Sequence, residues 1–202
     1  MTHAGYITLD VADTAAAERF YATDLGLSDV VRVRGSDEPA VGFRGFTLSL
    51  ILRQPSDVDA LVRVAVDAGA EVVTPATRSL WGYGGTLLAP DGTTCTVASA
   101  SKKDRGPATR RVDDVVLQLG VADVAASKAF YRDHGVAVAK SVGRRYAELD
   151  TGPVKVTLLR RDALAKAAGV PDDGGRPLGL AVASDVGPFT DPDGFVWESR
   201  VA

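Results

Sequence analysis

Residues 7–21 read ITLDVADTAAAERFY, and residues 117–131 read LQLGVADVAASKAFY. Within these stretches the triplet Val-Ala-Asp and the pair Phe-Tyr each recur at a separation of 110 residues. A third motif, Pro-Asp-Gly, occurs at 90–92 and again at 192–194, a separation of 102 residues. Two motifs at one spacing and a third at a shorter spacing indicate a duplication followed by a loop deletion. The chain therefore contains two related halves.

Each half begins with a pattern that predicts a strand followed by a helix. Apolar residues alternate with other residues at the start of both stretches, which is the period of a strand with one buried face. Asp13 and Asp123 then occupy the N-cap position before two Ala-rich segments. These segments predict helices over 14–24 and 124–134.

Short β-rich runs follow each of these helices and complete a β-α-β-β-β pattern in both halves. Residues 56–69 predict one further helix, capped by Ser56, without a clear counterpart in the second half. The expected fold class is α+β, built from two tandem βαβββ modules. We place the first module at 1–100, a polar linker at 101–111 and the second module at 112–202.

The composition excludes several classes of function. A net charge of −3 and a pI near 5.4 give no electrostatic reason to expect a nucleic acid or an anionic membrane as a partner. The apolar stretches are shorter than the roughly 20 residues of a membrane-spanning helix, and no secretory signal is visible. Because Cys95 is the single cysteine, a Cys-rich metal site is excluded. We expect a soluble cytoplasmic protein, either a monomer or a homodimer.

The stretches LDVAD…FYATDLGL, LGVAD…FYRDHG, SLWGYGGTLLAPDG and DPDGFVWES resemble the vicinal oxygen chelate superfamily. This superfamily includes glyoxalase I, extradiol dioxygenases, and the fosfomycin- and bleomycin-resistance proteins. The resemblance covers nearly the whole chain. It implies βαβββ modules whose curved mixed sheets enclose a cup, with the helices on the outer side, and family reactions take place inside that cup.

The resemblance also implies four positions for metal ligands, because family enzymes carry His, Gln or Glu at fixed distances from the repeated motifs. These positions are Tyr6, Thr96, Val116 and Glu198 in this chain. Only Glu198 keeps a usual ligand, and catalytic metal sites generally have at least three protein ligands. We therefore expect no metal and no other cofactor, with a divalent ion bound by Asp10 and Glu198 as the alternative.

The two histidines do not restore a metal site. His3 is expected in a frayed terminus or on the helix side of the first strand. His134 ends a predicted helix, where histidine commonly interacts with the last carbonyl groups. By strand parity Trp197 and Cys95 face the helix side, so we expect them in the core.

Polar residues on the opposite parity are the candidate lining of the cup, namely Tyr6, Thr8, Asp10, Gln118 and Glu198. A few polar groups in a mostly apolar cavity are typical of a small-molecule site, although the same residues would also suit a solvated sheet face. Asp10 and Glu198 are the candidate catalytic residues, because two nearby carboxylates can form an acid/base pair.

A Gly-rich stretch just before a strand supplies two aromatic candidates, Trp81 and Tyr83. A flexible loop carrying them would cover an apolar or aromatic ligand bound beside Thr96. Alternatively, Trp81 covers an interface between the modules.

Three functions remain open. The leading hypothesis is a metal-independent protein that binds a small aromatic or hydrophobic molecule, with drug sequestration as the family analogy. The alternative is a lyase, isomerase or dioxygenase that uses Glu198 as a metal ligand or a general base. The third is a ligand sensor or interaction module with a degenerate cup.

Overall fold

A computed structural model of the chain describes residues 4–37, 42–173 and 179–199. In chain order its elements are β1 (Ala4–Val11), α1 (Thr14–Glu18), β2 (Val31–Gly35), β3 (Phe46–Ile51), α2 (Pro55–Asp67), β4 (Glu71–Ser79), β5 (Gly82–Leu88), β6 (Thr94–Ser99), β7 (Asp114–Val121), α3 (Val124–Asp133), β8 (Val138–Val142), β9 (Tyr146–Leu149), β10 (Lys155–Arg160), α4 (Arg161–Ala168), β11 (Leu180–Ser184), β12 (Phe189–Thr190) and β13 (Val196–Ser199). A π-helical segment over Arg19–Asp24 continues α1. No helix in the described residues is long and apolar enough to cross a membrane.

The repeated stretches form the predicted strand and helix in both halves. The carboxylate of Asp13 accepts a hydrogen bond from the Ala16 amide, and that of Asp123 accepts from Ala125 and Ala126. Both aspartates are therefore confirmed as N-caps. The helix at 56–69 is also confirmed, but its cap is not Ser56. It begins at Pro55, which is favoured in the first helical turn, and so Gln54 is the N-cap.

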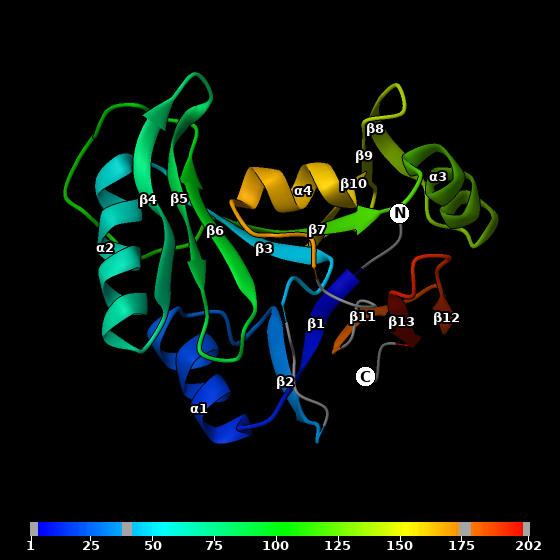
Figure 1. The fold of residues 1–202 in the computed structure, drawn as a ribbon, viewed down its shortest axis with the longest axis horizontal. Coiled ribbons are helices and arrows are strands. Elements are labelled where there is room, and N and C mark those ends of the chain that lie inside the picture. The colour runs from blue at the N-terminus through cyan, green and yellow to red at the C-terminus, as the bar shows by residue number, and fades with distance from the viewer. Residues whose placement is uncertain (1–3, 38–41, 174–178, 200–202) are drawn as a thin grey trace.

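The strands form two mixed sheets, and each sheet takes strands from both halves of the chain (Figure 1). The five-stranded sheet has the order β12-β13-β11-β1-β2, and the eight-stranded sheet has the order β4-β5-β6-β3-β7-β10-β9-β8. The predicted α+β class with curved mixed sheets is confirmed.

A complete βαβββ unit occurs twice, as β3-α2-β4-β5-β6 and as β7-α3-β8-β9-β10. The two units join through the antiparallel pair β3 and β7 to make the eight-stranded sheet. The outer segments β1-α1-β2 and β11-β12-β13 are shorter and join through the antiparallel pair β1 and β11. The division of the chain at residues 101–111 remains a prediction about its modules, because the sheets cross it.

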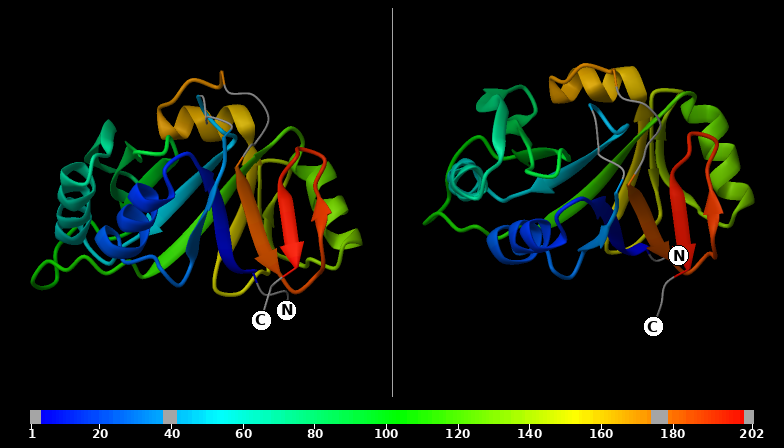
Figure 2. Two further views of the ribbon diagram at one scale, coloured as in Figure 1. Left: turned by 90° about the horizontal axis from the view of Figure 1, so that it is seen from below. Right: turned by 60° about the horizontal axis from the view of Figure 1, so that its bottom comes forward.

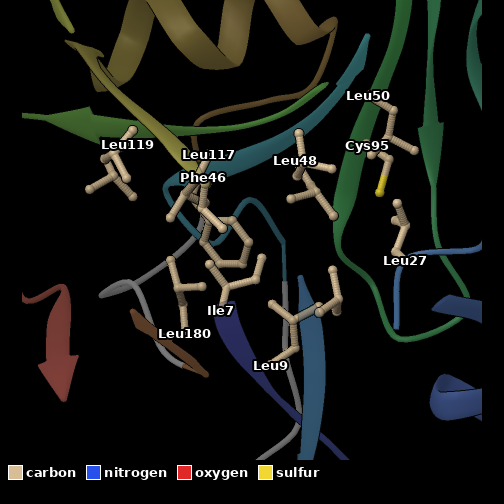
Figure 3. Close-up of a cluster of buried hydrophobic side chains, with 14 of the residues drawn as sticks. Ile7, Leu9, Leu27, Phe46, Leu48, Leu50, Cys95, Leu117, Leu119 and Leu180 are labelled. Atoms are coloured by element: carbon tan, nitrogen blue, oxygen red, sulfur yellow. The ribbon is translucent and has the colours of Figure 1, made fainter. Parts of the chain in front are cut away.

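The two sheets share one hydrophobic core. Ile7 and Leu9 of β1 belong to one cluster with Phe46 of β3 and with Leu117 and Leu119 of β7 (Figure 3), and all five side chains are buried. Burial of this apolar surface is the main favourable contribution to folding. We call the face of each sheet that points away from this core its cup face.

The repeated motifs also meet in space. The hydroxyl of Tyr21 donates to Asp91 at 2.8 Å, and the hydroxyl of Tyr131 donates to Asp191 at 2.6 Å. In each half the helix of the Phe-Tyr motif is thereby tied to the Pro-Asp-Gly turn. A buried polar group needs such a partner, which gives the recurring tyrosine a structural reason, although Asp91 lies inside the first Pro-Asp-Gly motif and Asp191 lies one residue before the second.

Helix α4 was not expected from the sequence. It lies on the cup face of the eight-stranded sheet, on the side turned away from β1 and β13 (Figure 2). The other three helices pack on the core side through buried residues of the main cluster. The prediction that all helices lie outside the cup is therefore wrong for α4.

Candidate functional site

The predicted metal positions fall into two pairs, one on each sheet. Tyr6 pairs with Ala183, and Ala183 pairs with Glu198, so Tyr6 and Glu198 stand in one row of the five-stranded sheet. Thr96 and Val116 both pair with Ser49 and stand in one row of the eight-stranded sheet. The expectation of a single cup floor is wrong, because strand pairing across the halves produces two separate cup faces.

The cup face of the five-stranded sheet carries a network of charges. Arg34 of β2 donates from Nε to Asp10 at 2.7 Å and from Nη1 to Glu198 at 2.9 Å. Because β1 and β11 lie between β2 and β13, the Arg34 side chain reaches across the sheet. Its hydrogen bonds to Asp10 and Glu198 raise the pKa of Arg34 above its ordinary value, so this cation does not titrate.

A second arginine lies beside this network. Arg32 of β2 stacks on the ring of Tyr6, with its guanidinium carbon 3.5 Å from the ring centroid. Thr8 lies opposite Arg32 in the pairing of β1 with β2. Sequence reasoning placed Tyr6, Thr8, Asp10 and Glu198 on one face, and the structure does bring them together. It missed Arg32 and Arg34, although their alternation in VRVRG predicts one shared face.

This donor set does not fit a catalytic metal ion. Within the described residues no group of three or more His, Cys, Asp or Glu side chains could hold one. The two carboxylates of the five-stranded sheet are bridged by the guanidinium of Arg34 rather than converging on an open position. On the other sheet, Val116 offers no donor atom and Thr96 is a rare ligand.

The cup face of the eight-stranded sheet is partly filled by α4. Leu164 and Ala165 are buried with Phe43 in a small cluster separate from the main core. Gly120 of β7 permits this approach, because a Cβ atom there would lie 2.7 Å from the Gly45 carbonyl oxygen and 3.0 Å from the Arg161 Cα.

A row of polar side chains lies along this face, consisting of Glu148, Thr157, Gln118 and Thr47 in adjacent strands. Thr47 donates to the side-chain oxygen of Gln118 at 2.8 Å. The hydroxyl of Thr157 is buried and has no hydrogen-bond partner among the described residues. Gln118 was a candidate for the same floor as Glu198, but it belongs to this second face.

Beside α4 the cup face stays open as a cavity of about 260 Å³. Its lining consists of Thr74, Thr77, Ser79, Trp81, Gly82, Tyr83, Gly84, Gly85, Thr86, Thr96, Ala98, Ser99 and Ala167. Trp81 stands in the turn between β4 and β5 with 89% of its surface exposed. The structure thus brings Trp81 and Thr96 to one cavity.

The Gly-rich stretch is a hairpin and not a loop. Gly84 and Gly85 lie inside β5, where a Cβ atom would meet the Val97 or the Thr74 carbonyl oxygen at 2.6 Å. Close strand approach explains these glycines. The expected role of Tyr83 as a cover for the cup is not supported. Its hydroxyl donates to Asp59 of α2 at 2.7 Å, on the core side of the sheet, and this bond raises its pKa.

Three other predictions are confirmed. Trp197 is fully buried, and its indole N–H donates to the hydroxyl of Tyr131 at 3.3 Å. Cys95 is buried, which raises the pKa of its thiol and opposes thiolate chemistry. His134 caps α3 and lies 2.8 Å from the carbonyl oxygen of Phe130. His3 lies outside the described residues.

A larger cavity of about 370 Å³ lies between α1 and the Pro90–Gly92 turn. Its carboxylates already have partners. Asp10 binds Arg34, Asp13 caps α1, and Asp91 accepts from Tyr21. We assign this space to helix packing, because none of these acidic groups is left without a partner.

Comparison with known proteins shows the fold. No protein-family model matches the chain, and no curated protein sequence matches it. Glyoxalase I from Zea mays is similar in structure, with a TM-score of 0.60 and 14% identity over 98% of this chain and 91% of that chain. A putative dioxygenase from Bacillus subtilis has a TM-score of 0.50 and 11% identity over 78% of this chain and 63% of that chain.

Proposed function

We propose that this chain, which has the fold of the vicinal oxygen chelate superfamily, is a metal-independent protein that binds a small aromatic or hydrophobic molecule. The observation that carries the proposal is the cavity of about 260 Å³ in which Trp81 and Thr96 meet beside the end of α4. The chemistry of its lining favours binding over turnover. It holds hydroxyls, glycines and one indole, and no carboxylate, imidazole or amine is among its residues.

The exposed indole supplies the affinity in this proposal. Covering an aromatic side chain contributes roughly 1.5–3 kcal/mol, and a stacked aromatic pair adds about 0.5–1.5 kcal/mol. Threonine hydroxyls around the floor would orient a polar substituent of the ligand. The volume lies just below the roughly 300–1,000 Å³ of drug-sized sites, so a ligand of one or two rings is expected.

Tryptophan fluorescence tests this proposal directly. The chain has two tryptophans, and Trp197 is buried in the core whereas Trp81 is exposed. Titration with a library of one- and two-ring aromatic compounds is therefore expected to change the emission of Trp81 alone. Trp81→Ala should weaken binding at least tenfold, in line with the roughly 2 kcal/mol assigned to the indole.

Leu80→Ala is the matched control, because Leu80 is the other exposed residue of the same turn. It should leave the affinity nearly unchanged. Failure of the whole library, or equal binding by wild type and Trp81→Ala, would contradict the proposal. Elemental analysis of protein purified without a chelator tests the metal-dependent alternative, since a stoichiometric transition metal would overturn metal independence.

Helix α4 partly fills the cup face of the eight-stranded sheet, and this favours a second candidate function, that of a ligand sensor. Helix α4 lies next to the cavity, and Ala167 contributes to its lining. A sensor would transmit binding through α4, whereas a simple binding protein would respond only in β4, β5 and β6. Amide hydrogen exchange with and without a bound compound separates the two by the position of the changed amides.

A further inference from the structure

The cup face of the five-stranded sheet has a cation fixed at its centre. Arg34 reaches from β2 to Glu198 on β13 and holds Asp10 on the way. We propose that this face is a second ligand site, where the guanidinium groups of Arg34 and Arg32 bind a small oxyanion, a carboxylate or a phosphate. This site is independent of the cavity beside Trp81, since it lies on the other sheet.

Arg34 keeps free donors for such a ligand. A guanidinium has five N–H groups, and the contacts with Asp10 and Glu198 engage Nε and Nη1. The Nη2 group has no partner among the described residues, and 49% of the side chain is exposed. The two carboxylates hold the guanidinium in place, so less side-chain freedom is lost when a ligand binds.

Arg32 supplies the second charge. Its guanidinium carbon lies 3.5 Å from the centroid of the Tyr6 ring, and this contact restricts the side chain while the guanidinium keeps its N–H donors. No carboxylate forms a salt bridge with Arg32 in the described part of the chain. A planar guanidinium edge matches the two oxygens of a carboxylate or phosphate, which makes paired hydrogen bonds possible.

The rest of the face is suited to a small ligand. Ala181 and Ala183 of β11 share this face with the longer side chains of β1 and β13, and both alanines are buried beneath those side chains and that of Arg34. Thr8 and Tyr6 add hydroxyl donors that have no hydrogen-bond partner among the described residues. These groups resemble the polar set of a small-molecule site.

The carboxylates limit the affinity. Asp10 and Glu198 offset much of the positive charge of Arg32 and Arg34, so an incoming anion is attracted only weakly. We therefore expect roughly millimolar dissociation constants. For the same reason Glu198→Gln should strengthen anion binding about threefold by removing one nearby negative charge, while Asp10 still holds Arg34.

Nuclear magnetic resonance titration tests the proposal, with acetate and inorganic phosphate added separately at constant ionic strength set by sodium chloride. Shifts are expected at Arg32, Arg34 and the amides of β1 and β2. Arg32→Ala leaves the Arg34 network intact and should weaken both anions about tenfold or more, the loss expected for a charged hydrogen bond. Arg145→Ala, which removes an exposed arginine in the turn between β8 and β9, is the matched control.

The outcomes are distinct. Saturable shifts that Arg32→Ala abolishes and Arg145→Ala preserves support the site, and the tighter of the two anions identifies the ligand source. The site is overturned by shifts that follow chloride concentration alone, by equal losses in the two arginine variants, or by weaker binding in Glu198→Gln. Trp81→Ala should retain anion binding, so failure here and failure of the proposed function are separable.

Discussion

The two cup faces of this protein have opposite contents. On the eight-stranded sheet a helix of the chain itself covers part of a floor that carries hydroxyl and amide groups and one carboxylate, Glu148, and the part over β4, β5 and β6 stays open. On the five-stranded sheet no helix of the described residues covers the cup face, which carries four charged side chains. One repeated architecture thus offers a neutral site beside Trp81 and a charged site around Arg34.

This difference follows from the part of the chain that lies on each cup face. Gly120 lets α4 approach β7 closely on the eight-stranded sheet. On the five-stranded sheet, Arg34 spans the face instead and bridges Asp10 and Glu198. The position of Glu198 therefore does not establish its role, because the neighbouring side chains decide whether it holds a metal or a guanidinium.

The largest expected effect concerns the packing of α4. Leu164→Ala removes a buried side chain from the small cluster that holds this helix and should lower the free energy of unfolding by about 2–4 kcal/mol. Val196→Ala on the open cup face, where the side chain is exposed, should cost below about 0.5 kcal/mol. Urea denaturation measures the free energy of unfolding of both variants. Equal losses would contradict the conclusion that α4 packs on one cup face whereas the other is exposed.

A smaller effect distinguishes the two repeated Tyr–Asp contacts. Asp91 lies 3.7 Å from the buried Arg44, whereas Asp191 forms no salt bridge in the described residues. Burial raises the pKa of Asp191, partly offset by hydrogen bonds from Tyr131 and Phe195. A raised pKa in the folded state means that folding favours the protonated form. The resulting stability is present below the ordinary pKa and is lost as the pH rises through the folded value.

Asp191→Asn removes this dependence. The difference in unfolding free energy between wild type and Asp191→Asn should therefore shift in favour of wild type as the pH falls from 7 toward the ordinary carboxyl pKa of about 4. Denaturation curves of both proteins at several pH values check the sign. A shift toward the variant at low pH would show that hydrogen bonding, and not burial, dominates at Asp191.

The smallest effect is expected on the charged face. Arg34→Ala removes two ion pairs whose side chains are 24–49% exposed, so the free energy of unfolding should fall by about 1 kcal/mol or less. The loss should shrink as salt is raised toward 1 M. Thermal unfolding at low and high salt provides the measurement, and a large salt-independent loss would mean that Arg34 acts through packing.

The local structure could be read from the sequence with good fidelity. The repeats predicted β1 and β7, the N-caps Asp13 and Asp123, and the burial of Trp197 and Cys95. These features depend on short-range periodicity and on groups a few residues apart. Helix α4 was not predicted from the sequence, although Leu164, Ala165 and Ala168 share one buried face and Gly169 ends the helix in the left-handed conformation.

The candidate site was harder to predict from the sequence than the local structure. Strand parity assigned residues such as Glu198 and Gln118 to a face of a sheet, but it did not say which sheet each strand joins. Tyr83 was expected on a flexible loop, but it lies in β5 and its hydroxyl donates to Asp59.

The sequence by itself determined the duplication, the α+β class and which side of β1, β6, β7 and β13 is buried, because these are properties of neighbouring residues. Only the tertiary structure decided that β1 pairs with β11 and that β3 pairs with β7. It also decided that α4 lies in one cup and that Arg34 bridges Asp10 and Glu198 in the other. Such contacts join residues far apart in the chain, and their energy comes from packing and charge that exist only once the sheets have formed.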